Sequence, residues 1–207
     1  MARLCQVHLK AKNYDSAIPV LKRLETEAEF PQNKTYAQSN LMKSYYEKQD
    51  FTNAVVYADK VLKNDKIDDR IKSDAQIIVA RSAIKTNDEA KAKEAYAKLQ
   101  KIAKGELAAE ALYYDAYFKN KEGKFESSNV VVQKIAQDYS GYKYYGAKSL
   151  VIMAKNFYGL KDSFQATYIL ESVIENFKEY TDVIEEAQKE LDFIKGEEAK
   201  RNSSITN

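Results

Sequence analysis

The first residues to consider for chemistry are Cys5 and His8, because the chain has only one cysteine and one histidine and they lie three residues apart. A catalytic thiol needs a base within hydrogen-bond reach and a third group that orients this base. The sequence supplies no such third group, so we interpret the pair as a small buried thiol and a partly exposed imidazole. A single Cys and a single His also exclude a disulfide framework and a His/Cys metal cage within one chain. We predict no catalytic residue, no metal site and no cofactor.

A second pattern, Gly123-Lys124 followed by two serines, resembles part of a phosphate-binding loop. The complete motif requires an earlier glycine where Phe118 stands, and no strand precedes it, so we reject this interpretation. Paired carboxylates catalyse when their environments differ, whereas neighbouring acids on exposed helices are solvated charges. The neighbouring acids of this chain are interpreted as solvated: Asp68-Asp69, Glu185-Glu186 and Glu197-Glu198.

The tyrosine-rich stretch from Tyr139 to Tyr145 lies beside Lys143 and Lys148 and has the side chains that stack nucleobases. The 33 Lys and Arg nearly balance the 31 Asp and Glu, and no broad basic stripe accompanies the tyrosines. We therefore predict that these tyrosines pack between neighbouring structural repeats and that the chain has no nucleic-acid partner. No apolar run approaches the roughly 20 residues that cross a bilayer, which argues against direct membrane insertion.

The composition indicates the elements that position these side chains. Among 207 residues, 44% are hydrophobic and 31% charged, with 6 Gly and 2 Pro, which favours helices over an all-β or disordered chain. Five segments share one layout and end in a small residue. These small residues are 37, 38, 36 and 38 positions apart, which indicates an internal repeat. They are Ala17, Ala54, Ala92, Ser128 and Ala166.

Each segment reads as the start of a helix. Four of the five open with Asn or Asp, which accept hydrogen bonds from the first free N–H groups of a helix. Apolar residues recur four and seven positions after each small residue, as Leu21 and Leu24 do after Ala17. A second helical pattern precedes each segment, with a small or apolar residue twelve positions before the small residue. These residues are Cys5, Met42, Ala80, Ala116 and Ala154.

Each repeat is therefore a helix, a short turn and a second helix. This layout resembles the tetratricopeptide repeat, although the period exceeds the usual ~34 residues and the family's early Trp and closing Pro are absent. The array is also loosely similar to multi-repeat proteins of bacterial cell envelopes. The resemblance implies an all-α fold, a right-handed superhelical array of antiparallel helix pairs. We expect five pairs in residues 1–180, the first truncated as in a piece of a longer protein.

A further helix is predicted after the fifth pair, at residues 181–200. Its apolar stripe is Val183, Ala187, Leu191 and Ile194, and its other positions are rich in Glu and Lys. Repeat arrays need a terminal helix with a polar outer face, so we interpret this segment as a capping helix. Residues 201–207 are expected to form a polar tail.

In tetratricopeptide arrays the first helices of the repeats line a concave groove, so the resemblance lets groove residues be assigned by register. We number each repeat from its small residue, position 0. Position −11 then carries cations in three repeats and Tyr117 in a fourth. The side chains expected to contact a partner are Lys43, Tyr46, Arg81, Tyr114, Tyr117, Lys155 and Tyr158.

Cations and tyrosines suit a protein or peptide partner with acidic side chains or a free carboxylate. The opposing interpretation is that these cations are solvated and the tyrosines pack between repeats. The resemblance thus favours a non-enzymatic protein-interaction scaffold. The alternative is a structural spacer, or a homo-oligomerisation segment, of a larger bacterial envelope protein without its own groove ligand. The sequence does not fix the compartment; the repeat style leans toward the bacterial periplasm or envelope.

Overall fold

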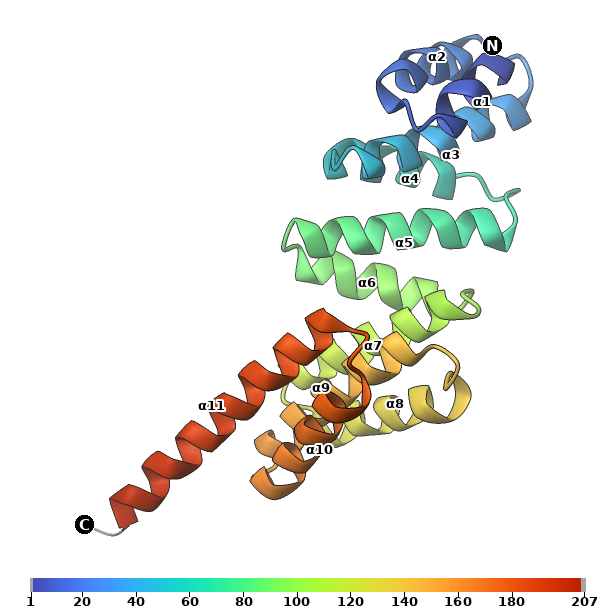
Figure 1. Ribbon diagram of the computed structural model, residues 1–207. Coiled ribbons are helices and arrows are strands. Elements are labelled where there is room, and N and C mark those ends of the chain that lie inside the picture. The colour runs from blue at the N-terminus through green and yellow to red at the C-terminus, as the bar shows by residue number, and fades with distance from the viewer. Residues whose placement is uncertain (1, 206–207) are drawn as a thin grey trace. The chain divides into compact units, whose positions relative to one another are not determined.

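The computed structural model describes the backbone of residues 2–205 and the side chains of residues 2–201. This part of the chain holds eleven α-helices and no strand, as the sequence predicts (Figure 1). The helices form two compact units, the first ending at Ala103 and the second beginning at Lys104. The sequence analysis expected five helix pairs in residues 1–180 and drew no boundary between units among them. None of the described helices is both long and apolar enough to span a membrane.

Unit 1 consists of three antiparallel helix pairs, α1/α2, α3/α4 and α5/α6, and the pairs adjoin because α2 lies beside α3 and α4 beside α5. The first helix of the first pair is short, as expected. The helices are α1 (Ala2–Lys10), α2 (Tyr14–Glu27), α3 (Pro31–Glu47), α4 (Phe51–Leu62), α5 (Asp69–Lys85) and α6 (Glu89–Leu99).

Unit 2 contains two pairs, α7/α8 and α9/α10, and a long final helix, α11, which lies beside both α9 and α10. The helices are α7 (Glu106–Lys121), α8 (Phe125–Asp138), α9 (Lys143–Gly159), α10 (Ser163–Asn176) and α11 (Thr181–Ile205).

The turn inside every pair repeats one backbone design. The residue two before each second helix has a positive φ, between 54° and 72°, and the next residue donates its N–H to a carbonyl five residues earlier. The side chains of Asn13, Asp50, Asp88 and Asp162 then accept a hydrogen bond from the second helix, which confirms the predicted caps. In the remaining turn, the side chain of Lys124 makes no such bond. The residue before it, Gly123, is the only glycine among the five positive-φ residues of these turns.

The small residues of the repeat explain the close approach of paired helices. All five residues at position 0 and all five at position −12 are fully buried. Around them, longer apolar side chains such as Leu21, Met42 and Leu99 fill the core of unit 1. The periodic small and apolar residues read from the sequence therefore form the interfaces within and between pairs.

Unit 2 has two packing features of its own. The ring of Phe125 lies so close to Gly159 that a β-carbon on this glycine would be 2.4 Å from it. The fully buried Asn156 amide donates to Ser128 Oγ at 2.9 Å and to Asn129 Oδ1 at 2.8 Å, and it accepts from Asn120. Ser128, the only hydroxyl residue at position 0, thus joins a polar network that links α7, α8 and α9.

The last helix is longer than predicted. The stripe of Val183, Ala187, Leu191 and Ile194 is buried against α9 and α10, as expected for a capping helix. The helix then continues to Ile205, so residues 201–205, which the sequence analysis assigned to a polar tail, are helical. Polar composition alone does not end a helix, and neither Gly nor Pro follows Gly196.

Candidate functional site

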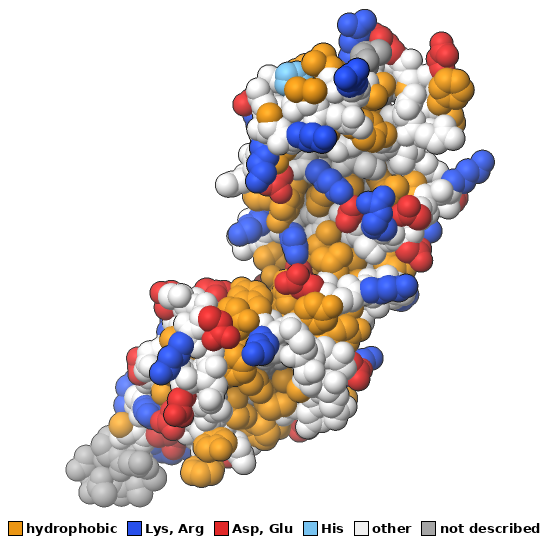
Figure 2. Space-filling view, turned by 45° about the vertical axis from the view of Figure 1, so that its right-hand side comes forward, with side chains coloured by type: hydrophobic (Ala, Val, Ile, Leu, Met, Phe, Trp, Pro, Cys, Tyr) orange, Lys and Arg blue, Asp and Glu red, His pale blue; other side chains and the backbone are white. Residues whose placement is uncertain are grey.

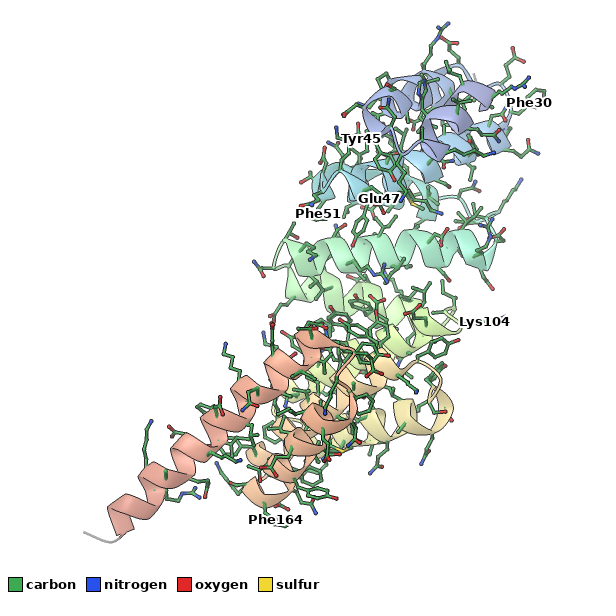
Figure 3. The ribbon with its side chains drawn as sticks, viewed as in Figure 1. Phe30, Tyr45, Glu47, Phe51, Lys104 and Phe164 are labelled. Atoms are coloured by element: carbon green, nitrogen blue, oxygen red, sulfur yellow. The ribbon has the colours of Figure 1, made fainter. Side chains whose placement is uncertain are left out.

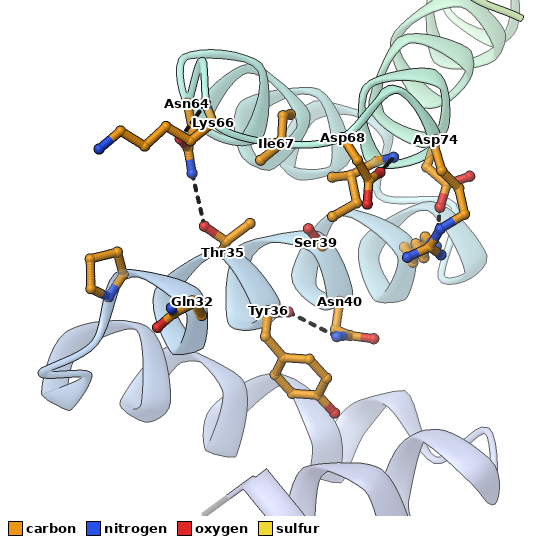
Figure 4. A pocket seen from close by; sticks show the side chains of 14 residues that line it. Gln32, Thr35, Tyr36, Ser39, Asn40, Asn64, Lys66, Ile67, Asp68 and Asp74 are labelled. Atoms are coloured by element: carbon orange, nitrogen blue, oxygen red, sulfur yellow. Dashed lines mark hydrogen bonds and ion pairs between the residues drawn. The ribbon is translucent and has the colours of Figure 1, made fainter.

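A hollow of about 770 Å³ in unit 1 lies between α3 and the start of α5 (Figure 4). Tyr36 and Asn40 of α3 line one side, and Ile67, Asp68 and Asp74 line the other. Local hydrogen bonds hold its walls. Asn64 of the α4–α5 connection donates to Thr35 at 3.0 Å, and Asn40 donates to the Tyr36 carbonyl at 2.8 Å. The hollow is therefore built mainly from first helices, the elements that the resemblance assigns to the groove.

A second hollow, about 400 Å³, continues along the same helices toward α1. Three predicted contact residues line it together: Lys43, Tyr46 and Arg81. The ring of Tyr46 packs edge-on against Phe51 with centroids 5.8 Å apart, which fixes its position. The two hollows share Asn40, Lys43 and Asp74 in their walls, so they adjoin each other, and we call the two together the groove of unit 1.

An ion pair crosses this groove. Lys43 Nζ lies 2.5 Å from Asp74 Oδ2, where the lysine side chain is 47% exposed. The cation predicted to meet a partner is therefore already paired with the next first helix. A partner carboxylate at this point competes with Asp74 for the same ammonium group.

The larger hollow has further charges at its rim. Lys66 and Arg70 line it, and within the described side chains neither makes a salt bridge. Asp68 caps α5 by accepting from the Ile71 N–H at 2.8 Å, so its carboxylate is engaged. With apolar Ile67 on the wall, the hollow offers cationic and amide groups around an apolar surface, which suits a polypeptide segment that carries acidic side chains.

The equivalent cation in unit 2 is enclosed. Lys155, at the same repeat position as Lys43, lies 2.7 Å from Glu186 and 3.8 Å from Glu190 of α11, and its side chain is only 26% exposed. Tyr158 packs edge-on against Phe193 of α11 at 5.8 Å. Both predicted contact residues of α9 therefore contact the chain's own terminal helix.

Tyr114 and Tyr117 are both half-buried in an aromatic cluster of α7. Tyr114 contacts Tyr113, Tyr117 and Phe118 at centroid distances of 5.0 to 6.2 Å. Burial raises the pKa of Tyr113 well above its usual value, so this phenol stays protonated. These tyrosines therefore pack against one another along α7.

The tyrosine-rich stretch at residues 139–145 is likewise engaged within unit 2. Tyr144 donates to Asp182 of α11 at 2.7 Å, and Tyr145 donates to the buried Glu110 at 2.7 Å. Lys148 lies over the rings of Tyr113 and Tyr144, 4.9 and 5.4 Å from their centroids. These contacts fasten α9 to α7 and α11, in accord with the predicted packing role.

Cys5 and His8, the nucleophile and base candidates of the sequence, differ in solvent exposure. Cys5 is fully buried, and burial raises the pKa of its thiol, which lowers the thiolate fraction. His8 is partly exposed. The described side chains contain no group of three or more His, Cys, Asp or Glu residues that could hold a metal ion.

On the surface face shown in Figure 2, Lys and Arg side chains of unit 1 are scattered among hydrophobic and acidic ones. This mixture agrees with the formal net charge of +2 and gives no continuous basic stripe on that face. This face therefore carries separate charges instead of a broad positive field.

Sequence reasoning missed several wall residues of the larger hollow, among them Tyr36, Ile67 and Arg70. Tyr36 lies in the second turn of α3, whereas Ile67 and Arg70 lie in the connection before α5 and at its start, where the repeat register is least defined. It also missed Asp74. One signal could have found it, because Asp74 follows Lys43 by 31 residues, as Glu186 follows Lys155.

Comparison with solved structures finds a similar fold. A tetratricopeptide repeat protein from Parabacteroides merdae superimposes with a TM-score of 0.73 over 98% of this chain and 75% of that chain, at 16% sequence identity. No family model and no curated protein matches the sequence. The chain therefore has the helix-pair fold of a tetratricopeptide repeat protein, as the repeat pattern predicted.

Proposed function

We propose that this chain, a stack of helix pairs with the tetratricopeptide fold, is a protein-interaction scaffold that binds a polypeptide partner in the groove of unit 1. The fold is typical of interaction scaffolds and is typically non-catalytic. The observation that carries the proposal is the adjacency of the two hollows, whose shared wall contains Asn40, Lys43 and Asp74. A preformed groove costs little reordering when a partner binds.

The partner suited to this groove carries acidic side chains or a terminal carboxylate. Lys43, Arg81 and Arg70 place cationic groups along α3 and α5, and Tyr46 adds a rigid aromatic surface held by Phe51. Charge-assisted hydrogen bonds are stronger than neutral ones, and aromatic and Arg side chains are the usual anchors of interfaces. The groove contacts of unit 2 predicted from the sequence are secondary in this proposal, because Lys155 and Tyr158 contact α11.

The experiment compares the wild-type protein with a Lys43→Glu/Arg81→Glu variant in a pull-down from the source cells, followed by binding measurements with the purified partner. We expect the variant to lose the partner while its circular dichroism and melting curve stay helical and cooperative. The matched control is Lys63→Glu/Lys101→Glu, which reverses two exposed cations of unit 1 outside both hollows. Equal capture by all three proteins would contradict the groove as the binding site.

The second candidate function is a structural spacer. The observation that favours it is the pairing of Lys43 with Asp74 and of Lys155 with Glu186, because these bonds brace consecutive first helices. A spacer predicts that charge reversal at Lys43 and Arg81 changes stability without changing any partner. The same pull-down therefore separates the two functions.

A further inference from the structure

The two hollows of the unit 1 groove differ in the balance of their charges. The smaller hollow is lined by two cations, Lys43 and Arg81, and by two acids, Glu47 and Asp74. Glu47, labelled in Figure 3, is the last residue of α3 and is exposed. The formal charges of this hollow therefore cancel, and any excess of positive charge in the groove belongs to the larger hollow.

The larger hollow has cations that its own acids do not neutralise. Lys43, Lys66 and Arg70 line it together with Asp68 and Asp74. Asp74 is paired with Lys43, and the carboxylate of Asp68 caps α5. Among the described side chains, Lys66 and Arg70 take part in no salt bridge. Two cations at this rim are thus left for carboxylates from another molecule.

Neither the neighbouring acids nor the repeat register accounts for these cations. Asp65 and Asp69 lie outside the wall of the hollow, and Asp69 pairs with Lys72 at 3.9 Å. Arg70 occupies position −22 of its repeat, where α3, α7 and α9 have no cation. Their residues at this position are Gln32, Glu106 and Tyr144. The helix pair as such therefore does not require positive charge here.

The wall between these charges is apolar. It includes Pro31 and the ring of Tyr36 from α3, and Ile67 and Ile71 from the side of α5. Figure 4 shows Ile67 and Tyr36 on opposite sides of the space. A volume of about 770 Å³ is within the range of ligand pockets, roughly 300–1,000 Å³. Aromatic side chains bring the most apolar area to such a wall, and a cation over the ring adds attraction.

Hydrogen bonds hold this wall in place. Asn64 of the α4–α5 connection donates to Thr35 of α3 at 3.0 Å and accepts from the Lys66 N–H at 3.1 Å. The Ile67 N–H donates to the Asn64 carbonyl at 3.4 Å. These bonds tie the connection to α3 and keep Ile67 on the wall. A fixed wall loses little free energy to ordering when a ligand binds.

We propose that the larger hollow is the specificity pocket of the groove. It holds a large aromatic side chain of a partner protein, flanked by acidic side chains that pair with Lys66 and Arg70. This inference rests on the proposed function and names the segment that the groove of unit 1 recognises. The two cations come from different elements, the α4–α5 connection and α5, so they suit two acidic side chains better than one terminal carboxylate.

The probe is a synthetic peptide, acetyl-Glu-Glu-Trp-Glu-Glu-amide, which has no free terminal carboxylate. The chain contains no tryptophan, so under selective excitation the tryptophan emission reports only the surroundings of the peptide's own indole. With the full-length wild-type chain we expect a saturable shift of this emission to shorter wavelength. The matched peptide acetyl-Lys-Lys-Trp-Lys-Lys-amide should show no shift.

The charge variant is Lys66→Gln/Arg70→Gln. We expect it to bind the acidic peptide at least about tenfold more weakly and with a smaller dependence on salt, because both rim cations are gone. The control, Lys63→Gln/Lys101→Gln, removes two exposed lysines of unit 1 that lie outside both hollows, and it should bind as the wild type does.

The wall variant is Ile71→Ser, which removes apolar surface from the hollow at a partly exposed position. We expect at least about fivefold weaker binding and a smaller emission shift. The control is Ile18→Ser, because Ile18 is also partly exposed in unit 1 and lines neither hollow. Circular dichroism checks that every variant keeps its helices.

Three results with the peptides would overturn the inference. The first is no saturable shift with the wild type, or an equal shift with the lysine peptide. The second is wild-type affinity in both the charge variant and the wall variant, which would place the aromatic side chain outside the hollow. The third is tighter binding of acetyl-Glu-Glu-Trp with a free carboxyl end, which would assign the cations to a terminal carboxylate.

The partner captured in the pull-down separates this inference from the proposed function. If Lys43→Glu/Arg81→Glu loses the partner while the charge variant and the wall variant bind it as the wild type does, the groove is the binding site but the larger hollow is not its specificity pocket. If Lys43→Glu/Arg81→Glu keeps the partner, the proposed function fails, whatever the peptides show.

Discussion

The two units carry the same ion pair on their first helices in different surroundings. In unit 1 the pair of Lys43 and Asp74 stands in an open groove, with the lysine side chain 47% exposed. In unit 2 Lys155 of α9 pairs with Glu186 of α11, with a second acid of α11 3.8 Å away and the lysine side chain 26% exposed. The difference teaches that a residue's place in the repeat sets its contacts along the array, while the neighbouring helix decides whether it can reach a partner.

A second difference concerns buried polar groups at position −10. Unit 2 has Asn156, whose amide makes three hydrogen bonds, whereas unit 1 has Ser44 and Ser82, whose buried hydroxyl oxygens have no partner among the described residues. Satisfied buried networks stabilise and define packing, while an unsatisfied hydroxyl costs free energy. At position −10 the buried polar groups are therefore better satisfied in unit 2 than in unit 1.

The largest expected effect on the free energy of unfolding comes from substitutions at position −10. Asn156→Ala should lower the free energy of unfolding by about 2–3 kcal/mol, because it opens a cavity and leaves the Ser128 side of the network incomplete. Ser44→Ala should change it by less than about 0.5 kcal/mol or raise it slightly. Urea unfolding followed by circular dichroism measures both. Equal losses in the two variants would remove the contrast between the units.

The ion pairs should give the next largest difference. Lys155→Met should destabilise the protein by about 1–2 kcal/mol, because Glu186 and Glu190 lose their shared cation in a partly enclosed site. Lys43→Met should cost less than about 1 kcal/mol, as exposed pairs do. Thermal melts at low and high salt measure the two, and salt should reduce the effect at Lys43 more. A larger loss at Lys43 would contradict the greater enclosure of Lys155.

One second helix of unit 2, α8, lacks the capping hydrogen bond that the second helices of unit 1 have, so a new cap there should add stability. Lys124 begins α8 without a capping bond, whereas Asp50 and Asp88 accept one from Asn53 and Lys91. Lys124→Asp should therefore stabilise the protein by about 0.5–1 kcal/mol, and Asp88→Ala should destabilise it by a similar amount. Urea midpoints at constant slope check both. No gain from Lys124→Asp would show that the turn at Gly123 cannot orient a capping carboxylate.

The smallest effect is a pH dependence specific to unit 1. Burial of Glu25 acts to raise its pKa, but hydrogen bonds from Gln38 at 2.9 Å and Lys60 at 3.0 Å hold this pKa below its usual value. A carboxyl with a lowered folded-state pKa stabilises the fold above its unfolded pKa, near 4.3, and this stabilisation is lost as the pH falls through the folded value.

The melting temperature of Glu25→Gln should accordingly fall less than that of the wild type when the pH is lowered from 7 to 3. The matched control is Glu94→Gln, whose exposed carboxylate pairs with Lys98 along one helix instead of between helices. Parallel pH profiles of wild type and Glu25→Gln would contradict the assignment.

Most of the fold could be predicted from the sequence, because it depends on local signals. The small residues at positions 0 and −12 and the Asn or Asp caps recur at a fixed period, and all of them occupy the predicted places. The length of α11 was missed because no residue type marks its end.

The candidate site could be predicted only in part. Register placed Lys43, Tyr46 and Arg81 on one surface, and they line one hollow. The same register placed Lys155 and Tyr158 on a first helix, but it could not show that α11 contacts both. The walls formed by the α4–α5 connection lie outside the helical periodicity, so Ile67 gave no signal as a wall residue.

The most direct test places a photoreactive amino acid at matched positions in the two units. Tyr46 and Tyr158 share position −8 and are both aromatic, so benzoylphenylalanine is a conservative replacement at either. The account predicts that the probe at position 46 crosslinks the partner, whereas the probe at position 158 crosslinks α11 of the same chain near Phe193. Partner adducts at position 158 and none at position 46 would contradict the assignment of the binding groove to unit 1.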